Sequence, residues 1–124
     1  MSIIRVNLGA KSYNIEIAAG LLDTAGEKIR SISKAQRAAV ISDSNVDALY
    51  GERLQEALAG SGFKVTRIVF PAGEKSKCLA ELAKIYDRLA EAGITRSELV
   101  VALGGGVTGD LGGFAAAAFL RGVE

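Results

Sequence analysis

The sequence contains no histidine and no tryptophan, and it has a single cysteine, a single proline and a single methionine. Without histidine, this chain alone cannot build a Ser-His-Asp or Cys-His catalytic device, or a zinc site of His and Cys ligands. Cys78 cannot form an internal disulfide, because it has no partner in the chain. Its position at the start of a helical pattern predicts a small, partly buried apolar side chain rather than a reactive thiol.

The sequence also lacks a long apolar run and an excess of charge of one sign. No stretch reaches the roughly 18 apolar residues of a membrane-spanning helix, and no charged-then-apolar leader follows Met1. A net charge of +1 offers little attraction to nucleic acid or to an anionic membrane. We therefore expect a cytoplasmic protein with no nucleic-acid or membrane partner. A chain of 124 residues, 49% of them hydrophobic, fits one globular domain with a modest core.

Hydrophobic periodicity predicts a short hairpin followed by alternating strands and helices. The alternation in 2–8 and 13–18 indicates two antiparallel strands around a turn. The later strands carry apolar residues on both faces, which is typical of a parallel sheet covered on two sides. The predicted class is therefore α/β, doubly wound, with a mainly parallel sheet and an N-terminal antiparallel hairpin. Strands are expected at 37–42, 64–70 and 97–103, and helices at 21–32, from about 45 to 60, 78–93 and from the glycine cluster to about 120.

Six glycines lie between Gly104 and Gly113, where the last strand meets the last helix. Each glycine costs roughly 0.5–1 kcal/mol relative to alanine inside regular structure, so such a cluster calls for a specific reason. At the strand end, missing side chains would allow a phosphate to approach the helix N-terminus, although close packing alone is the alternative. For Gly112 and Gly113, one turn further on, packing is the preferred interpretation. The spacing of Gly104, Gly106 and Gly109 matches G-x-G-x-x-G, which is a weak signal on its own.

Two other turns between a strand and a helix carry polar residues. Asp43 and Asn45 follow one strand, and either helix capping or contact with a ribose explains them. Lys75 and Lys77 precede the next helix, where cations oppose the helix dipole; an anionic ligand or simple solvation would account for them. Asp110 suits the dipole of the last helix or contact with a ligand. In a parallel sheet all three turns lie at one edge, which favours a dinucleotide site there.

At these residues the sequence resembles the 3-dehydroquinate synthase family of sugar-phosphate cyclases. The blocks "SDSNVDALYGERLQEAL", "FPAGEKSK" and "ELVVALGGGVTGDLGGFAAAAFLRGV" occur in family order and spacing, and together they span most of the chain. The resemblance implies a Rossmann-like fold and NAD as cofactor. It implies that Asp43 and Asn45 contact the adenosine half of NAD, and that Gly73, Glu74 and Lys77 contact the ribose and nearby groups. It also implies that Asp110 faces the nicotinamide half. The residues implied to run along the pyrophosphate are Gly104, Gly105, Gly106, Val107 and Gly109.

The resemblance also implies what the rest of such an enzyme supplies. The family continues into a mostly helical second domain that carries the ligands for zinc or cobalt, so we expect residues 1–124 to be a truncated N-terminal NAD-binding domain without catalytic or metal-binding residues of its own. Arg121 corresponds to the family's substrate-binding arginine, which serves a neighbouring subunit in a homodimer. The implied reaction is 3-dehydroquinate formation from a sugar phosphate in the shikimate pathway, with the isolated chain inactive. The alternatives are an inosose or valiolone synthase, a more distant dehydrogenase resembling glycerol dehydrogenase, and a non-catalytic nucleotide-binding module.

Overall fold

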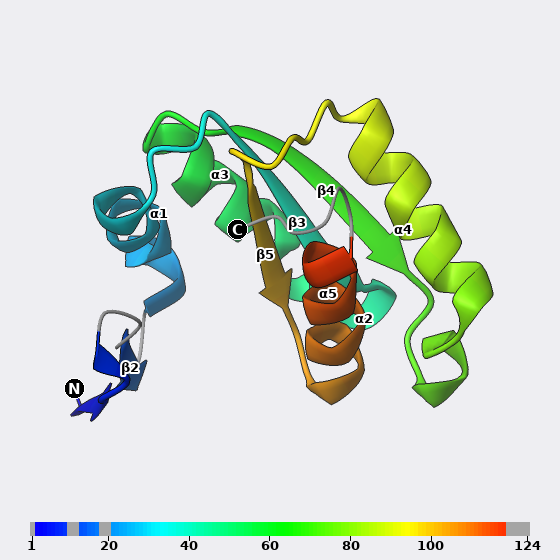
Figure 1. Cartoon of the computed structure of the whole chain (residues 1–124), viewed down its shortest axis with the longest axis horizontal. Helices are drawn as coiled ribbons and strands as arrows, with labels where there is room; N and C mark the ends of the chain where they lie inside the picture. The colour runs from blue at the N-terminus through cyan, green and yellow to red at the C-terminus, as the bar shows by residue number, and fades with distance from the viewer. Residues whose placement is uncertain (1, 10–12, 18–20, 119–124) are drawn as a thin grey trace.

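A three-stranded parallel sheet forms the centre of the molecule in the computed structural model, which describes residues 2–9, 13–17 and 21–118 (Figure 1). Strand β3 (Arg37–Asp43) lies between β4 (Lys64–Phe70) and β5 (Leu99–Leu103) and runs parallel to both. The five residues 38–42 of β3 are fully buried, as expected for a central strand that has neighbours on both sides and helices on both faces.

The predicted N-terminal hairpin is confirmed. Strand β1 (Ser2–Val6) pairs antiparallel with β2 (Tyr13–Ile17), and Ile4 lies opposite Ile15. The two strands form a sheet of their own rather than extending the parallel sheet.

Helices cover both faces of the parallel sheet, so the doubly wound arrangement is confirmed. Helices α4 (Leu79–Glu91) and α5 (Gly106–Ala118) pack on one face, and α1 (Leu21–Ile32) and α3 (Glu52–Gly60) pack on the other. Figure 1 shows this layering, with α4 and α5 on the opposite side of the strands from α3. The first cluster centres on Ile41, Phe70, Ile85, Leu89 and Leu111, and the second centres on Val40, Leu54, Leu58 and Phe63.

Two details of α4 differ from the expectation. Cys78, the residue before the helix, is exposed instead of partly buried. The helical spacing of Leu79, Leu82, Tyr86 and Leu89 predicts that these four residues share one apolar face. In the structure Leu79 is 82% exposed and Tyr86 is half-buried, and the buried residues of α4 are Leu82, Ile85 and Leu89.

The segment predicted as one helix up to Gly60 contains a wider turn. Helix α2 (Ser44–Val46) continues as a π-helical turn, η2 (Asp47–Gly51), before α3 begins. The carboxylate of Asp47 lies 3.4 Å from the guanidinium of Arg67 on β4, and a Cβ on Gly51 would collide with both groups. The wider turn therefore accommodates an ion pair that periodicity does not reveal.

A buried carboxylate organises the edge of the sheet where its strands begin. Glu98 precedes β5 and is 7% exposed, and its Oε2 accepts hydrogen bonds from the backbone N–H groups of Gln36 at 3.2 Å and Arg37 at 2.8 Å. The Arg37 guanidinium lies 3.6 Å from the other carboxylate oxygen. These contacts join the starts of β3 and β5.

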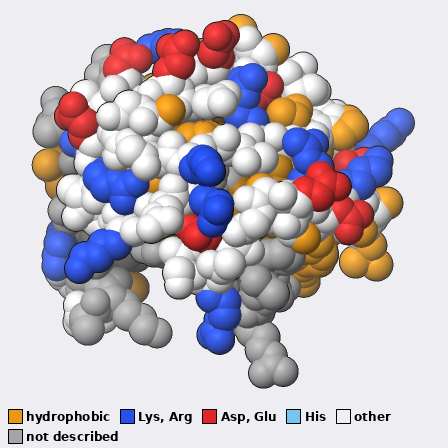
Figure 2. Space-filling model, turned by 90° about the horizontal axis from the view of Figure 1, so that it is seen from above, with side chains coloured by type: hydrophobic (Ala, Val, Ile, Leu, Met, Phe, Trp, Pro, Cys, Tyr) orange, Lys and Arg blue, Asp and Glu red, His pale blue; other side chains and the backbone are white. Residues whose placement is uncertain are grey.

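The surface carries charges of both signs. In the face shown in Figure 2, lysine and arginine side chains lie among acidic and apolar ones, and neither sign covers the whole face. Among the described helices, none combines the length and the apolar character that crossing a membrane requires.

Candidate functional site

The three turns singled out in the sequence meet at the carboxyl edge of the parallel sheet, as predicted. We call this edge the rim and define it as residues 43–46, 71–78 and 104–110. Strand pairing places Ser42 opposite Leu103 and Asp43 opposite Phe70. From β3 the chain proceeds to α3 on one face, and from the neighbouring β5 it proceeds to α5 on the other face. Adjacent strands whose helices diverge in this way leave a crevice where open α/β sheets bind ligands.

Side-chain hydrogen bonds connect the turns of the rim. The Ser42 hydroxyl donates to the carbonyl oxygen of Leu103 at 2.7 Å, which links the ends of β3 and β5. The Ser44 hydroxyl accepts from the backbone N–H of Ala72 at 3.0 Å, and the Ser76 hydroxyl donates to the carbonyl of Pro71. These three bonds therefore tie the turns of the rim to one another and to the ends of the strands.

At the end of β3, helix capping accounts for one oxygen of Asp43. Its Oδ1 accepts a hydrogen bond of 2.8 Å from the backbone N–H of Val46, the usual contact of a capping residue. Asn45 lies on α2 with an exposed side chain. Capping of α2 by Asp43 is thus confirmed, and contact of Asp43 and Asn45 with a ribose stays a prediction.

The glycine turn offers bare backbone to the solvent. No atom lies within 4 Å of the Cβ positions of Gly105, Gly106 and Gly109, so this part of the rim is not filled by other side chains of the described chain. Val107 is half-buried beside these glycines. The open space and the first N–H groups of α5 fit the pyrophosphate of a dinucleotide, which needs close approach and unpaired donors.

For the remaining glycines of the cluster, close packing and the approach of a ligand are the two interpretations to compare. A Cβ at Gly112 would lie 3.2 Å from the Cβ of Ala102, so the packing interpretation is confirmed there. At Gly113 packing against the sheet is wrong, since that position is exposed with nothing within 4 Å, and packing against a neighbour stays a prediction. Gly104 adopts a φ of +148°, which favours glycine, and its Cβ position lies 2.7 Å from the hydroxyl of Thr108.

Thr108 was not singled out in the sequence. It is the third residue of α5 and is 1% exposed, and its hydroxyl oxygen has no hydrogen-bond partner in the described part of the chain. Leaving a buried hydroxyl unpaired costs about 1–3 kcal/mol. A threonine after three glycines carries no sequence signal of this kind, because only the packing of the turn shows that its hydroxyl is buried.

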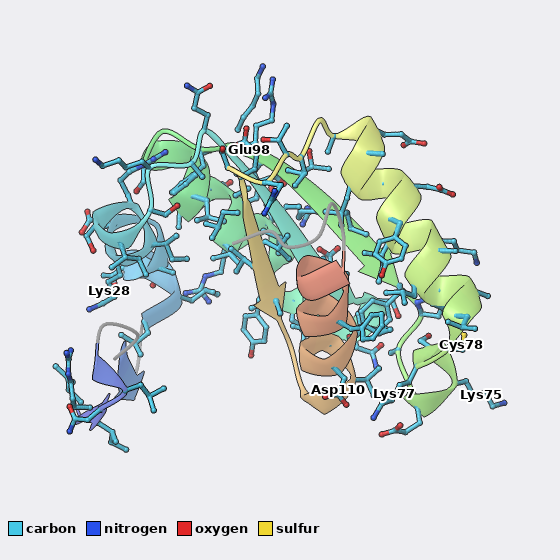
Figure 3. All side chains as sticks on the ribbon, in the orientation of Figure 1. Lys28, Lys75, Lys77, Cys78, Glu98 and Asp110 are labelled. Atoms are coloured by element: carbon cyan, nitrogen blue, oxygen red, sulfur yellow. The ribbon has the colours of Figure 1, made fainter. Side chains whose placement is uncertain are left out.

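An ion pair crosses the rim from the loop before α4 to α5. The Lys77 ammonium lies 2.8 Å from Oδ2 of Asp110, and Figure 3 shows the two side chains pointing toward one another. The hydrogen bond to Asp110, with its negative charge, raises the pKa of Lys77. Asp110 is the fifth residue of α5, beyond the first turn, so the helix-dipole explanation is wrong for it. Asp110 itself relieves part of the conflict between Lys77 and the α4 dipole.

Gly73 and Glu74 lie on the same loop. Gly73 has a φ of +115° and precedes a short 3-10 turn, η3 (Glu74–Ser76), and both Gly73 and Glu74 are exposed at the rim. Lys75 points away from the Lys77–Asp110 pair (Figure 3). Beside the pair, a pocket of about 390 Å³ opens between α4 and α5, with mostly apolar walls that include Leu82, Leu111 and Phe114.

Two further expectations concern Arg121 and metal-binding side chains. Arg121 lies outside the described residues, so its predicted role is not examined by the structure. Within 2–9, 13–17 and 21–118, no group of three His, Cys, Asp or Glu side chains is close enough together to bind a metal ion.

Curated proteins similar to this chain include several 3-dehydroquinate synthases. A family model described as "3-dehydroquinate synthase N-terminal" matches residues 67–124. The chain is 46% identical to the 3-dehydroquinate synthase of Clostridium acetobutylicum over 124 residues, and 48% identical to that of Paracoccus denitrificans over 121 residues. These alignments cover 100% and 98% of the chain but 35% and 33% of the two relatives. The chain thus spans about a third of the length of the curated relatives it matches.

Solved structures of two other cyclases share the fold of this chain. A 2-deoxy-scyllo-inosose synthase complexed with carbaglucose-6-phosphate, NAD⁺ and Co²⁺ matches with a TM-score of 0.85 and 26% identity, covering 98% of this chain and 33% of that one. The 2-epi-5-epi-valiolone synthase of Streptomyces hygroscopicus, with NAD⁺ and Zn²⁺ bound, matches with a TM-score of 0.75 and 30% identity over 95% of this chain and 32% of that one.

The parallel sheet and its two helical layers are structurally similar to the Rossmann-like domains of sugar-phosphate cyclases. Within that class, residues 67–124 match the N-terminal part of the 3-dehydroquinate synthase family, and the whole chain aligns with about a third of the length of curated 3-dehydroquinate synthases.

Proposed function

We propose that this chain is the NAD-binding part of a 3-dehydroquinate synthase. Such an enzyme converts 3-deoxy-D-arabino-heptulosonate 7-phosphate to 3-dehydroquinate and phosphate, a step of aromatic amino acid biosynthesis in the cytoplasm. The observation that carries the proposal is the open glycine turn at a rim where two other polar turns converge. Relatives with this name align with the whole chain, which supports the choice of reaction.

We assign the residues of the rim to successive parts of the dinucleotide. Asp43 uses one carboxylate oxygen as a helix cap, so its second oxygen is available to a ribose hydroxyl beside Asn45. Glu74 and Lys77, with Gly73 before them, extend toward the ribose and nearby groups from the neighbouring loop. The backbone of Gly104, Gly105, Gly106, Val107 and Gly109 follows the pyrophosphate, and Asp110 faces the nicotinamide half.

NAD would supply the hydride acceptor and donor of this reaction, and a divalent metal would act from residues outside this chain. The cyclase structures that contain NAD⁺ with Co²⁺ or Zn²⁺ support both groups as cofactors of the whole enzyme. This chain's own residues bind and orient the dinucleotide, so we expect no turnover by the chain alone. A homodimer in which Arg121 reaches the neighbouring subunit's substrate belongs to the same proposal.

Another cyclase reaction, such as inosose synthesis, is the second candidate, and the fold match at a TM-score of 0.85 favours it. Sequence identity favours 3-dehydroquinate synthase, at 46–48% against 26% for the inosose synthase.

Two measurements test the proposal. Calorimetric titration of the purified chain with NAD⁺ should show saturable binding, and an absence of binding would contradict the cofactor role. In the second, the chain replaces the aligned segment of the Clostridium acetobutylicum enzyme, and phosphate release from the heptulosonate phosphate is measured. We expect the chimera to be active. A chimera that folds and binds NAD⁺ but releases no phosphate would contradict the assigned reaction.

A further inference from the structure

The unpaired hydroxyl of Thr108 lies directly beneath the glycine turn. Its oxygen is buried, and it is 2.7 Å from the Cβ position of Gly104, so the side chain occupies the space under the turn. Buried polar atoms in native proteins nearly always have a hydrogen-bond partner, and an exception calls for an explanation. A methyl group would fill the same space without this cost, so packing alone does not explain a hydroxyl here.

The carbonyl groups on either side of Gly104 are already engaged. The carbonyl of Leu103 accepts from the Ser42 hydroxyl at 2.7 Å, and the carbonyl of Gly105 accepts from the N–H of Gly109 at 3.0 Å. The peptide unit that joins Gly104 to Gly105 lies between these two engaged carbonyl groups. Both of its flanking residues are glycines, so it can rotate without moving a side chain, and the Cβ position of Gly105 faces open space.

A planar trans peptide directs its C=O and its N–H to opposite sides. If the Gly104 carbonyl turns inward to Thr108, the Gly105 N–H turns outward to the rim. The same rotation would satisfy the buried hydroxyl and add a donor at the place where an anionic ligand approaches the start of α5.

We propose that Thr108 is a positioning residue for the dinucleotide. When NAD binds, the Thr108 hydroxyl donates a hydrogen bond to the carbonyl oxygen of Gly104, and this bond orients the Gly105 N–H toward the pyrophosphate. The inference rests on the proposed function, since it requires that a dinucleotide occupies the rim. It adds a side chain that does not touch the ligand but controls the backbone group that does.

The test separates this role from simple packing. Thr108→Val keeps the shape and removes the hydroxyl. Because the hydroxyl has no partner among the described residues, the melting temperature of this variant should be equal to or above that of the unaltered chain. Its Kd for NAD⁺ in calorimetry should rise about tenfold, the loss expected for one buried hydrogen bond. Thr108→Ser, which restores a hydroxyl, should bind within about threefold of the unaltered chain.

The control is Thr66→Val, which removes a partly buried hydroxyl from β4, away from the glycine turn, and should leave the Kd unchanged. As a direct readout, the Gly105 amide resonance should shift on addition of NAD⁺ in the unaltered chain and in Thr108→Ser, but much less in Thr108→Val. If the unaltered chain binds NAD⁺ and Thr108→Val binds it equally well, the inference is overturned while the proposed function stands. If the unaltered chain does not bind NAD⁺, the proposed function itself fails.

Discussion

At the scale of single residues, the glycine turn depends on side chains that are absent. Gly106 begins α5 and has open space at its Cβ position, so a larger residue there fits the protein but occupies the room assigned to the pyrophosphate. We predict that Gly106→Val raises the Kd for NAD⁺ at least tenfold in calorimetry, with the fold retained. Gly113→Val is the matched control, because it makes the same change at an open position further along the same helix. Equal losses in both variants would contradict the site.

Glu98 shows how much one buried carboxylate contributes at the opposite edge of the sheet, where Figure 3 places it far from Asp110. Replacing it with alanine leaves the N–H groups of Gln36 and Arg37 without their acceptor. We predict that Glu98→Ala lowers the free energy of unfolding by about 1–3 kcal/mol in urea denaturation, because two partly buried donors lose their acceptor. Glu56→Ala, at an exposed position, should change it by less than about 0.5 kcal/mol.

The Lys77–Asp110 pair gives a prediction about protonation. Asp110 raises the pKa of Lys77, so the pairing is complete below the ordinary lysine pKa and is lost as the pH rises through the raised value. We predict that Asp110→Asn lowers the pKa of Lys77, followed by NMR of its side-chain nitrogen, while Asp87→Asn on α4 leaves it unchanged. A Lys77 pKa that is the same in Asp110→Asn would show that the pair does not form in solution.

At the scale of elements, the contact of α1 with α3 depends on Gly26. A Cβ at this position would overlap the backbone carbonyl of Ala57, so the two helices can approach only without it. We predict that Gly26→Ala lowers the free energy of unfolding by about 1–3 kcal/mol, since the helices must move apart. Gly60→Ala, at an open position in α3, should leave it unchanged or raise it by up to about 1 kcal/mol. A neutral Gly26→Ala would mean that the helices pack differently.

Element types and their order were predictable from the sequence, because β3 contains the continuous apolar run 38–41 and α4 has clear helical periodicity. The convergence of the three turns was predictable for the same reason, since parallel strands place their carboxyl ends together. The exposed Cys78 and Leu79 were not predictable, because the periodicity of a helix does not say where the sheet beneath it ends. Similarly, the π-helical turn η2 includes Asp47, whose ion-pair partner Arg67 is distant in sequence.

The pairing of side chains at the site could not be predicted from the sequence. The polar residues of the rim were found from their types and positions, but the pairing of Lys77 with Asp110 joins two segments that only the fold brings together. The unpaired hydroxyl of Thr108 depends on a few ångströms of packing under one turn. Sequence patterns thus locate the rim, and the structure shows which of its groups are already engaged.

At the scale of the whole molecule, the two edges of the sheet have separate roles. The edge near Glu98 carries hydrogen bonds that stabilise the fold, and the rim carries open backbone and polar side chains. The account therefore requires that a dinucleotide perturb only one edge.

Titration of the isotope-labelled chain with NAD⁺, followed by amide NMR, tests this requirement directly. We predict saturable shifts at residues 43–46, 71–78 and 104–110, with the amides of Gln36, Arg37 and Glu98 unchanged. Resonances that do not shift at the rim, or that shift mainly at the opposite edge, would contradict the central claim that these three turns form one NAD site.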